Sequence, residues 1–247
     1  MNELWEELKP HLNEGMNTTM IYRWVSQYLR EHSEGLAARY SLKKAIMEMG
    51  PSGYPFEKLV SKVLDKEDFR TQTSQILNGI CVNHEVDVVA QKENRIQYIE
   101  CKYHNKRDVN CDVKVPLYIH SRFNDLVAFA RQQGIQKEYE SWIYTNTGFT
   151  EDAIQYATCS KLHLVAWNYP KNNGLNDRLD RLKIYPITCL TTISSDEKAL
   201  LMSKDIILVQ ELLSNTRVLR NLSLTQERRH RIMNECLHLT EENHGKK

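Results

Sequence analysis

The chain has 247 residues, 41% of them hydrophobic and 26% charged, and its formal net charge is +1. These proportions are typical of a soluble globular protein. A net charge so close to zero excludes a uniformly basic surface, so any nucleic-acid-binding surface must be a local patch.

Several features bear on location. No apolar run approaches about 18 residues, so no membrane-spanning helix is expected. The opening MNELWEELKPHLNEG is acidic and lacks the apolar stretch of a secretory signal. Six cysteines are scattered without a CxxC pair, which disfavours a disulfide framework or a zinc ribbon and fits a reducing compartment. We therefore expect a cytoplasmic protein.

The first part of the chain, residues 1–49, is predicted to be helical. Ile21, Val25 and Leu29 recur at helical spacing behind Thr18 or Thr19 as the N-cap. A second helix follows over LAARYSLKKAIMEMG and ends at Gly50.

Next come a helix and three strands. After the turn-rich GPSGYP, the segment FEKLVSKVL places its apolar residues on one stripe of a helix. Strands are predicted at 70–77, 84–91 and 96–103, joined by turns at Asn78-Gly79 and Glu93-Asn94.

The remaining elements alternate between helix and strand. A helix is predicted over 113–133, a buried strand over SWIYTN, a helix over TEDAIQYATCS capped by Thr150, and a strand over LHLVAWN. This order predicts an α/β fold in which helices cover the faces of a mixed sheet. From residue 191 onward short helices are expected, beginning with a capping box from Ser194 to Glu197.

The predicted hairpin between the second and third strands carries unusual charges. With Glu93 and Asn94 at the centre of the turn, directly opposed residues share a face. One face is then mostly apolar, and the other places Asp87 opposite Glu100 and Glu85 opposite Lys102.

Two opposed carboxylates repel, and the pKa of one of them should rise unless a cation lies between them. A hard cation such as Mg²⁺ accepts carboxylate oxygens and would relieve the repulsion. Lys102 lies on the same face as Glu100, within reach of a water or phosphate that such an ion holds. The set is suited to metal-assisted phosphodiester hydrolysis.

A second interpretation of these charges remains open. An E-x-K triplet is expected by chance in a charged chain of this length, and Glu85 and Lys102 could form a surface ion pair of about 0.2–1 kcal/mol. Spacing alone does not decide between a metal site and a solvated face.

Longer motifs point to a family. The ordered segments GYPFEKLVSKVL, GICVNHEVDVVA, IQYIECKYH and WIYTNTGFTEDAIQYATCSKLHLVAWNYP resemble the Mrr-like restriction endonucleases of the PD-(D/E)XK nuclease superfamily, over residues 50–190. The resemblance implies a restriction-endonuclease-like mixed sheet and cleavage of DNA with Mg²⁺ or Mn²⁺. It implies Asp87 and Glu100 as metal ligands, Lys102 as the catalytic lysine, and Glu57 as the helical acid that completes the site. Alternatively, Glu57 complements the dipole at a helix N-terminus.

Both ends of the chain carry weaker resemblances. Residues 15–49 resemble the C-terminal helices of an ATP-cone, a nucleotide-binding regulatory module. The chain lacks the basic, glycine-containing strand that opens such a module, and GxxxxGK[ST] is absent, so nucleotide binding is not expected.

Residues 191–247 are expected to form a helical region, which resembles helix-hairpin-helix DNA-binding modules. The hairpin glycine is replaced by Asn221-Leu222-Ser223. Candidate DNA-binding residues are Arg228, Arg229 and Arg231 here, with Lys114 and Arg122 on the helix over 113–133; each could equally lie on a solvated or salt-bridged helix face.

These observations predict a Mg²⁺-dependent DNA endonuclease that serves restriction, defence or DNA processing. Double-strand cutting by one active site per chain would imply a homodimer. Two alternatives remain: a nucleic-acid-binding protein that keeps the nuclease fold without activity, and an ATP-cone-type regulator.

Overall fold

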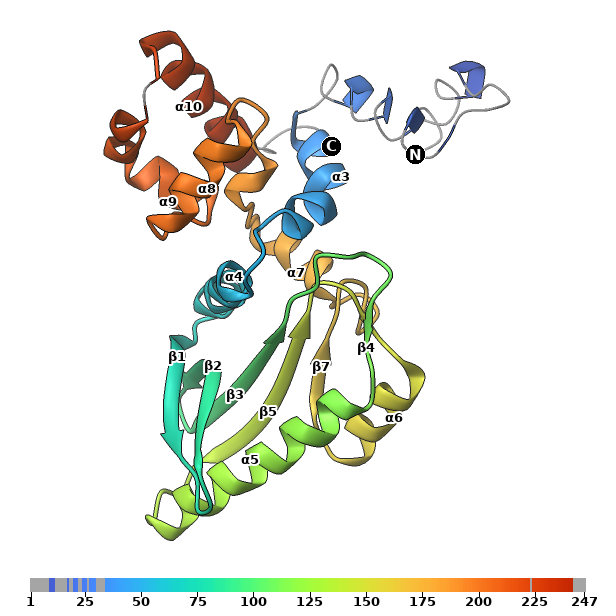
Figure 1. Ribbon diagram of the computed structural model, residues 1–247, viewed down its shortest axis with the longest axis vertical. Coiled ribbons are helices and arrows are strands. Elements are labelled where there is room, and N and C mark those ends of the chain that lie inside the picture. Colours follow the sequence, from blue (N-terminus) through green and yellow to red (C-terminus); the bar gives the residue numbers. More distant parts are fainter. Residues whose placement is uncertain are drawn as a thin grey trace.

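The structure is a computed structural model that describes residues 9–11, 17, 20, 21, 24, 25, 27–29, 34–222 and 224–241. It consists of an α/β part built on a twisted sheet and a group of C-terminal helices at one end of that part (Figure 1). None of the helices in the described ranges is long and apolar enough to cross a bilayer.

The main sheet is mixed, as predicted. Its strands are β1 (Arg70–Asn78), β2 (Asn83–Lys92), β3 (Arg95–Lys102), β5 (Glu138–Thr145) and β7 (His163–Val165), in the spatial order β1-β2-β3-β5-β7. The first three strands pair antiparallel, and β5 joins β3 and β7 in parallel. A second, two-stranded sheet of β4 (Asn110–Cys111) and β6 (Gly148–Phe149) was not predicted, because two-residue strands carry no periodic pattern.

Helices cover both faces of the sheet. Helix α4 (Tyr54–Lys66) packs on the face that carries Ile99 and Tyr144, whereas α5 (Lys114–Gln132) and α6 (Glu151–Cys159) cover the opposite face, which carries Ile143 (Figure 1). Ile143 and Tyr144 are neighbours in β5 and enter opposite cores because side chains alternate along a strand. The predicted α/β class with helices on both faces is confirmed.

Local sequence explains where the helices form. The predicted apolar stripe of α4 is buried throughout, at Phe56, Leu59, Val60, Val63 and Leu64. Helix α6 is capped as predicted, because Thr150 Oγ1 accepts a hydrogen bond from the Ala153 N–H at 3.3 Å. The predicted capping box of α8 (Ser195–Ser203) is also present, between Ser194 and Glu197.

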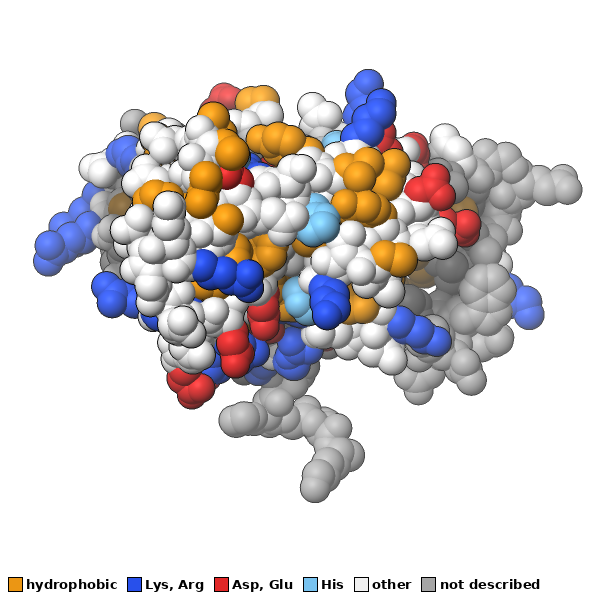
Figure 2. Space-filling model, turned by 90° about the horizontal axis from the view of Figure 1, so that it is seen from below, with side chains coloured by type: hydrophobic (Ala, Val, Ile, Leu, Met, Phe, Trp, Pro, Cys, Tyr) orange, Lys and Arg blue, Asp and Glu red, His pale blue; other side chains and the backbone are white. Residues whose placement is uncertain are grey.

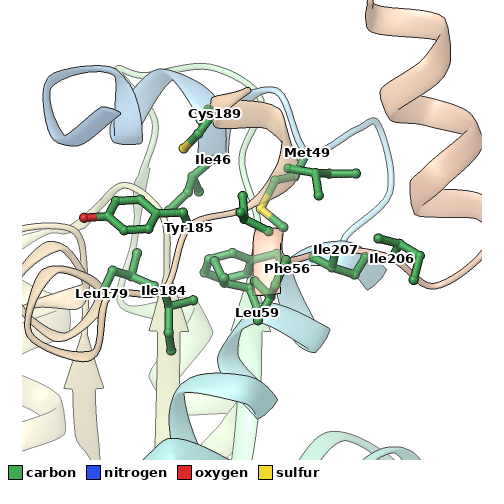
Figure 3. Close-up of a cluster of buried hydrophobic side chains, with 14 of the residues drawn as sticks. Ile46, Met49, Phe56, Leu59, Leu179, Ile184, Tyr185, Cys189, Ile206 and Ile207 are labelled. Carbon is green, nitrogen blue, oxygen red and sulfur yellow. The ribbon is translucent and has the colours of Figure 1, made fainter. Parts of the chain in front are cut away.

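One hydrophobic core joins residues 42–49 and the C-terminal helices to the sheet. Figure 3 shows Ile46 and Met49, at the end of α3 (Glu34–Met47), packed with Phe56 of α4 and with Ile206 and Ile207. The same core includes α7 (Leu175–Leu182), η2 (Ile187–Cys189), α9 (Val209–Ser214), η3 (Thr216–Asn221) and α10 (Gln226–Glu241). The core therefore crosses both boundaries predicted at 49/50 and 190/191.

Some local details differ from the predictions. Asn17 Oδ1 accepts a hydrogen bond from the Met20 N–H at 3.0 Å, and the predicted N-caps Thr18 and Thr19 lie outside the described residues. A short helix, η1 (Lys9–His11), lies further toward the N-terminus. Helix α7 was not predicted, although its three leucines at 175, 179 and 182 have helical spacing.

The turn predicted at Asn78-Gly79 is longer than expected. The β1–β2 connection spans 79–82 and closes with a hydrogen bond from the Gly79 N–H to the Val82 oxygen at 2.9 Å. Asp125 of α5 accepts from the Cys81 N–H at 2.9 Å and lies so close to Gly79 that a Cβ there would be 2.0 Å from its carboxylate. The connection is therefore shaped by a helix distant in sequence.

Candidate active site

The β2–β3 hairpin brings the candidate residues together. Its register is the predicted one, with Val88 opposite Ile99, Ala90 opposite Gln97, and a turn at Glu93-Asn94. The backbone ladder ends at the Val88–Ile99 pair, so the predicted pairings of Asp87 with Glu100 and of Glu85 with Lys102 lie just beyond it. There the Asp87 carboxylate accepts a hydrogen bond from the Cys101 N–H at 2.7 Å. A side chain thus replaces the missing backbone partner.

Glu100 is buried and lies between two cations. Only 5% of the residue is exposed, and its two carboxylate oxygens pair with the Lys102 ammonium and the Arg122 guanidinium. Arg122 is itself 9% exposed and donates to the backbone oxygen of Glu85 at 2.8 Å. Lys102 pairs with Glu100 rather than with Glu85, so the predicted surface ion pair is not formed.

The carboxyl groups of the site influence one another. Burial, and then the neighbouring Glu100, raise the pKa of Asp87 to about 6, although the Cys101 N–H and the nearby cations oppose the rise. Burial, and then Asp87, Glu85 and Glu100, raise the pKa of Glu57 to about 7. The acids of β2, β3 and α4 therefore share one region of negative potential, which Arg122 and Lys102 neutralise only in part.

Lys102 keeps its proton in this region. Burial alone lowers its pKa, but the hydrogen bond to Glu100 and the charges of Glu100 and Asp87 outweigh burial and raise it above the ordinary value. At neutral pH this side chain is therefore a cationic hydrogen-bond donor.

The donor set fits a hard divalent cation in its chemistry. Asp87, Glu57 and Glu100 offer only carboxylate oxygens, which Mg²⁺ and Mn²⁺ prefer. Within the described ranges, however, no three His, Cys, Asp or Glu side chains are grouped closely enough to hold an ion. Each oxygen of Glu100 already pairs with one cation, Lys102 or Arg122, so an ion bound by Glu100 would share this carboxylate with them.

Two histidines flank these residues. His84 Nε2 lies 2.8 Å from Asp125 Oδ2, and this hydrogen bond is the main reason why the pKa of Asp125 falls to about 2. His84, in β2, thus shares Asp125 with the β1–β2 connection. His104 donates its backbone N–H to Asn146 Oδ1 at 2.8 Å, and burial lowers its imidazole pKa, with a smaller contribution from Lys102.

The candidate DNA-binding residues have different surroundings. Lys114 is exposed in the first turn of α5. Arg122 lies inside the site with its guanidinium engaged by Glu100, which is not the surface contact that the sequence predicted. In α10, Arg228 pairs with Glu197 at 2.9 Å, Arg229 donates to the Leu224 oxygen, and Arg231 is exposed.

The ion pair between Arg122 and Glu100 was missed by sequence reasoning. Tyr118 lies one turn earlier on α5, and the Arg122 guanidinium is 5.5 Å from its ring. A tyrosine and an arginine at this helical spacing indicate a shared face, but not the buried acid beneath them.

The lower end of the molecule, seen in Figure 2, mixes hydrophobic, basic, acidic and histidine side chains. Its charge is therefore not of one sign, as expected from the net charge of +1. Any contact with a nucleic acid on this face would depend on a local set of residues.

Comparisons with known proteins assign two parts of the chain to family models. Residues 49–169 match the family model described as restriction endonuclease, and residues 185–240 match the one described as AF1548-like, C-terminal. An uncharacterised protein of Archaeoglobus fulgidus is 37% identical over 131 residues, which are 53% of this chain and 71% of that protein.

Two solved structures are similar to this chain. The crystal structure of AF1548, a protein of unknown function, superimposes with a TM-score of 0.63 and 30% identity, covering 77% of this chain and 99% of that one. The restriction endonuclease MspJI, solved with an oligonucleotide, gives a TM-score of 0.41 at 12% identity, covering 68% of this chain and 35% of its own. Nothing about this chain follows from similarity at the latter level.

The fold and the match over residues 49–169 indicate a restriction-endonuclease-like domain. More particularly, the chain belongs to the AF1548-like family, whose C-terminal region follows that domain at 185–240. The predicted kinship with restriction endonucleases is confirmed, whereas the ATP-cone resemblance and the PD-(D/E)XK roles of individual residues stay predictions.

Proposed function

We propose that this protein is an endonuclease that hydrolyses DNA phosphodiester bonds with the help of Mg²⁺ or Mn²⁺. The observation that carries the proposal is the meeting of Asp87, Glu100 and Lys102 where the β2–β3 ladder opens, with Glu57 close enough to share their potential. This group lies in the domain that matches restriction endonucleases.

Each residue has a defined role in this proposal. Asp87, Glu57 and Glu100 hold the divalent cation, which when bound neutralises phosphate charge and acidifies water. Lys102, protonated at neutral pH, donates to a phosphate oxygen. Arg122 holds the Glu100 carboxylate in place.

The number of active sites bears on how the protein would cut a duplex. A chain with one such site cuts one strand of a duplex, so two copies would be needed for a double-strand break. We propose restriction or DNA processing as the process served and a homodimer as the form that cuts both strands.

The test is cleavage of supercoiled plasmid in Mg²⁺ or Mn²⁺. The protein should nick or linearise the plasmid, and Lys102→Ala and Asp87→Ala should each lower the rate by about a hundredfold or more. Matched controls are the exposed Lys171→Ala and Asp152→Ala, which should cleave at the wild-type rate. Thermal melting checks that all four variants fold. Undiminished cleavage by both site variants would refute the assignment.

A non-catalytic DNA-binding protein is the second candidate. The observation in its favour is that Glu100 is already neutralised by Lys102 and Arg122 without any ion. Saturable DNA binding without cleavage in Mg²⁺, Mn²⁺ or Ca²⁺ would support this candidate and exclude the nuclease.

A further inference from the structure

A cleft lies on the opposite face of the sheet from Glu100 and Lys102. It has a volume of about 250 Å³ and is bounded by the end of α4, by α7, by the first half of β3 and by the second half of β5. Gln97 is at its base, three residues before Glu100 in β3, which corresponds to roughly 10 Å along the strand. The cleft and the candidate active site are therefore separate.

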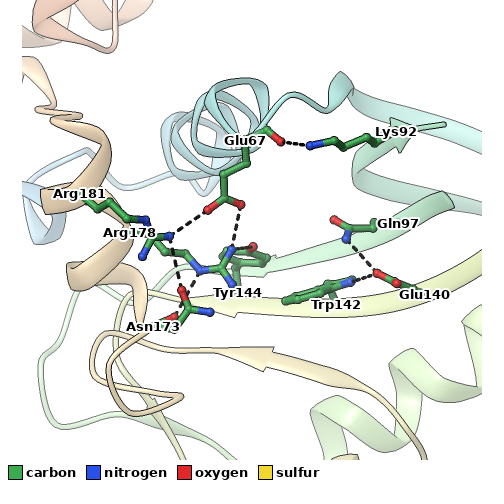
Figure 4. A network of polar contacts seen from close by, with 9 residues as sticks. All are labelled: Glu67, Lys92, Gln97, Glu140, Trp142, Tyr144, Asn173, Arg178 and Arg181. Carbon is green, nitrogen blue, oxygen red and sulfur yellow. Dashed lines mark hydrogen bonds and ion pairs between the residues drawn. The ribbon is translucent and has the colours of Figure 1, made fainter.

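The base of the cleft holds a buried acceptor without a partner. Gln97 is 3% exposed and its Nε2 donates to Glu140 Oε2 at 2.9 Å, while its Oε1 has no hydrogen-bond partner among the described residues. Figure 4 shows this oxygen turned away from Glu140. If the Gln97 amide were turned the other way, its oxygen would face the Glu140 carboxylate and be repelled. Glu140 therefore determines that Oε1, and not Nε2, is the atom of Gln97 without a partner.

Glu140 is itself held in position. Trp142 Nε1 donates to the same Glu140 oxygen, also at 2.9 Å (Figure 4). The free acceptor of Gln97 is thus presented by a rigid arrangement, and a buried unpaired carbonyl costs free energy unless a ligand or solvent donates to it.

The walls of the cleft are flat and polarisable. Trp142, Tyr144 and Phe69 line it, and the Arg178 guanidinium lies 5.7 Å from the Trp142 ring. Arg178 is committed to the fold, since it bonds both Glu67 and the Tyr144 hydroxyl at 3.1 Å and so ties α7 to α4 (Figure 4). Aromatic rings and guanidinium planes are the groups on which nucleobases stack.

Two further arginines could meet an anion. The side chains of Arg95 and Arg181 line the cleft and are 44% and 52% exposed. Arg95 lies 4.0 Å from Glu140 Oε1, whereas Arg181 pairs with Glu67 at 3.2 Å, so Arg95 is the less engaged of the two. The cleft thus combines a buried acceptor, flat walls and exposed guanidinium groups.

We propose that this cleft binds one nucleobase that carries an exocyclic amino group, with the attached phosphate at Arg95 and Arg181. The amino group donates to Gln97 Oε1. Uracil and thymine present their one N–H between two carbonyl oxygens, and these oxygens are repelled by the acceptor of Gln97. The cleft is at the small end of ligand sites, so it takes a single nucleotide unit, which is either a free nucleotide or a base turned out of a nucleic acid strand.

The test uses the full chain without divalent metal, in EDTA, so that it does not depend on nuclease activity. Calorimetric titration compares AMP, CMP, GMP and UMP. A second pair of probes separates the two sources: a strand of about twelve thymidines, and the same strand with one adenosine. The variants are Arg95→Gln, Gln97→Met and, as a control, the distant and exposed Arg217→Gln.

We expect at least one amino-bearing monophosphate, or the adenosine-containing strand, to bind roughly five- to tenfold more tightly than its uracil or thymine counterpart. Arg95→Gln should weaken that binding, Gln97→Met should remove the preference, and Arg217→Gln should change neither. A preference seen only with the strands assigns the cleft to nucleic acid, and one seen with monophosphates assigns it to free nucleotide.

Equal binding of all bases, an unchanged affinity in Arg95→Gln, or no saturable binding by any probe would overturn the proposal. If Gln97→Met does not fold, as judged by thermal melting, the base panel and Arg95→Gln decide. Loss of plasmid cleavage in the active-site variants with base preference intact would separate the two sites.

Discussion

The carboxylate of Asp87 accepts a hydrogen bond from the backbone N–H of Cys101 at 2.7 Å, just where the β2–β3 ladder ends. This contact orients Asp87 toward Glu100 and the start of the opening between the strands. Asp87 therefore has two properties that a substitution can separate, its negative charge and its ability to accept this hydrogen bond.

The substitution Asp87→Asn tests that separation. The amide oxygen still accepts from Cys101, but the charge is lost, so divalent-metal affinity should fall by about tenfold or more. The folded state should be at least as stable as wild type at pH 7, because burial and Glu100 already disfavour the ionised form. Calorimetric titration with Mn²⁺ and thermal melting measure the two effects. Unchanged Mn²⁺ affinity would remove Asp87 from the proposed metal set.

Arg122 should be essential for stability. Arg122→Met leaves the buried charge of Glu100 with Lys102 as its remaining partner, and breaking a buried pair typically costs about 3–5 kcal/mol. The exposed Arg131→Met on the same helix should change the free energy of unfolding by less than about 0.5 kcal/mol. Urea unfolding measures both.

A double variant identifies the cause of the stability loss in Arg122→Met. Adding Glu100→Gln to Arg122→Met removes the uncompensated charge and should restore part of the lost stability. No recovery would show that Arg122 stabilises through packing rather than through Glu100.

The stability of the metal-free protein should fall as pH rises. The folded-state pKa of Glu57 is raised from 4.5 to about 7 and that of Asp87 from 3.8 to about 6. Across these windows the folded state binds more protons than the unfolded chain, so the stability these groups contribute at low pH is lost on the way to neutral pH. Glu57→Gln should flatten the decline, whereas the exposed Glu138→Gln should not.

Melting temperature against pH, in EDTA, gives the comparison. Added Mg²⁺ should raise the melting temperature more at pH 8 than at pH 5, since the ion competes with protons for the same carboxylates. Identical slopes for wild type and Glu57→Gln would contradict the raised pKa of Glu57.

Glu235 should hold α10 in place. Its carboxylate accepts from the backbone N–H and hydroxyl groups of both Thr191 and Thr192, with N–H distances of 2.7 and 3.0 Å. Glu235→Gln keeps one accepting oxygen and puts an NH₂ donor against the N–H of the other threonine, so it should cost about 1–3 kcal/mol. The neighbouring exposed Asn234→Ala serves as the control in chemical unfolding. Equal stability of the two variants would refute this role.

Elements with a strong local signal were predictable. The stripe of α4 follows from helical spacing, and the register of the β2–β3 hairpin follows from the turn at Glu93-Asn94 because a two-residue turn sets every later pair. The Thr150 cap is also a local property. Helix α7 was not predicted because it is short and no hydrophobic run adjoins it. Its residues Leu175 and Leu179 are nevertheless completely buried.

The amino-acid sequence by itself determined the longer strands and helices, the hairpin register, and the grouping of Asp87, Glu100 and Lys102 on neighbouring strands, because these depend on spacing within short segments. Only the tertiary structure decided that Arg122 of α5 neutralises Glu100 and that Glu140 of β5 orients Gln97 of β3. Both contacts join residues more than twenty positions apart through a helix crossing the sheet and a parallel strand pair. Their geometry comes from packing of whole elements, which no local pattern encodes.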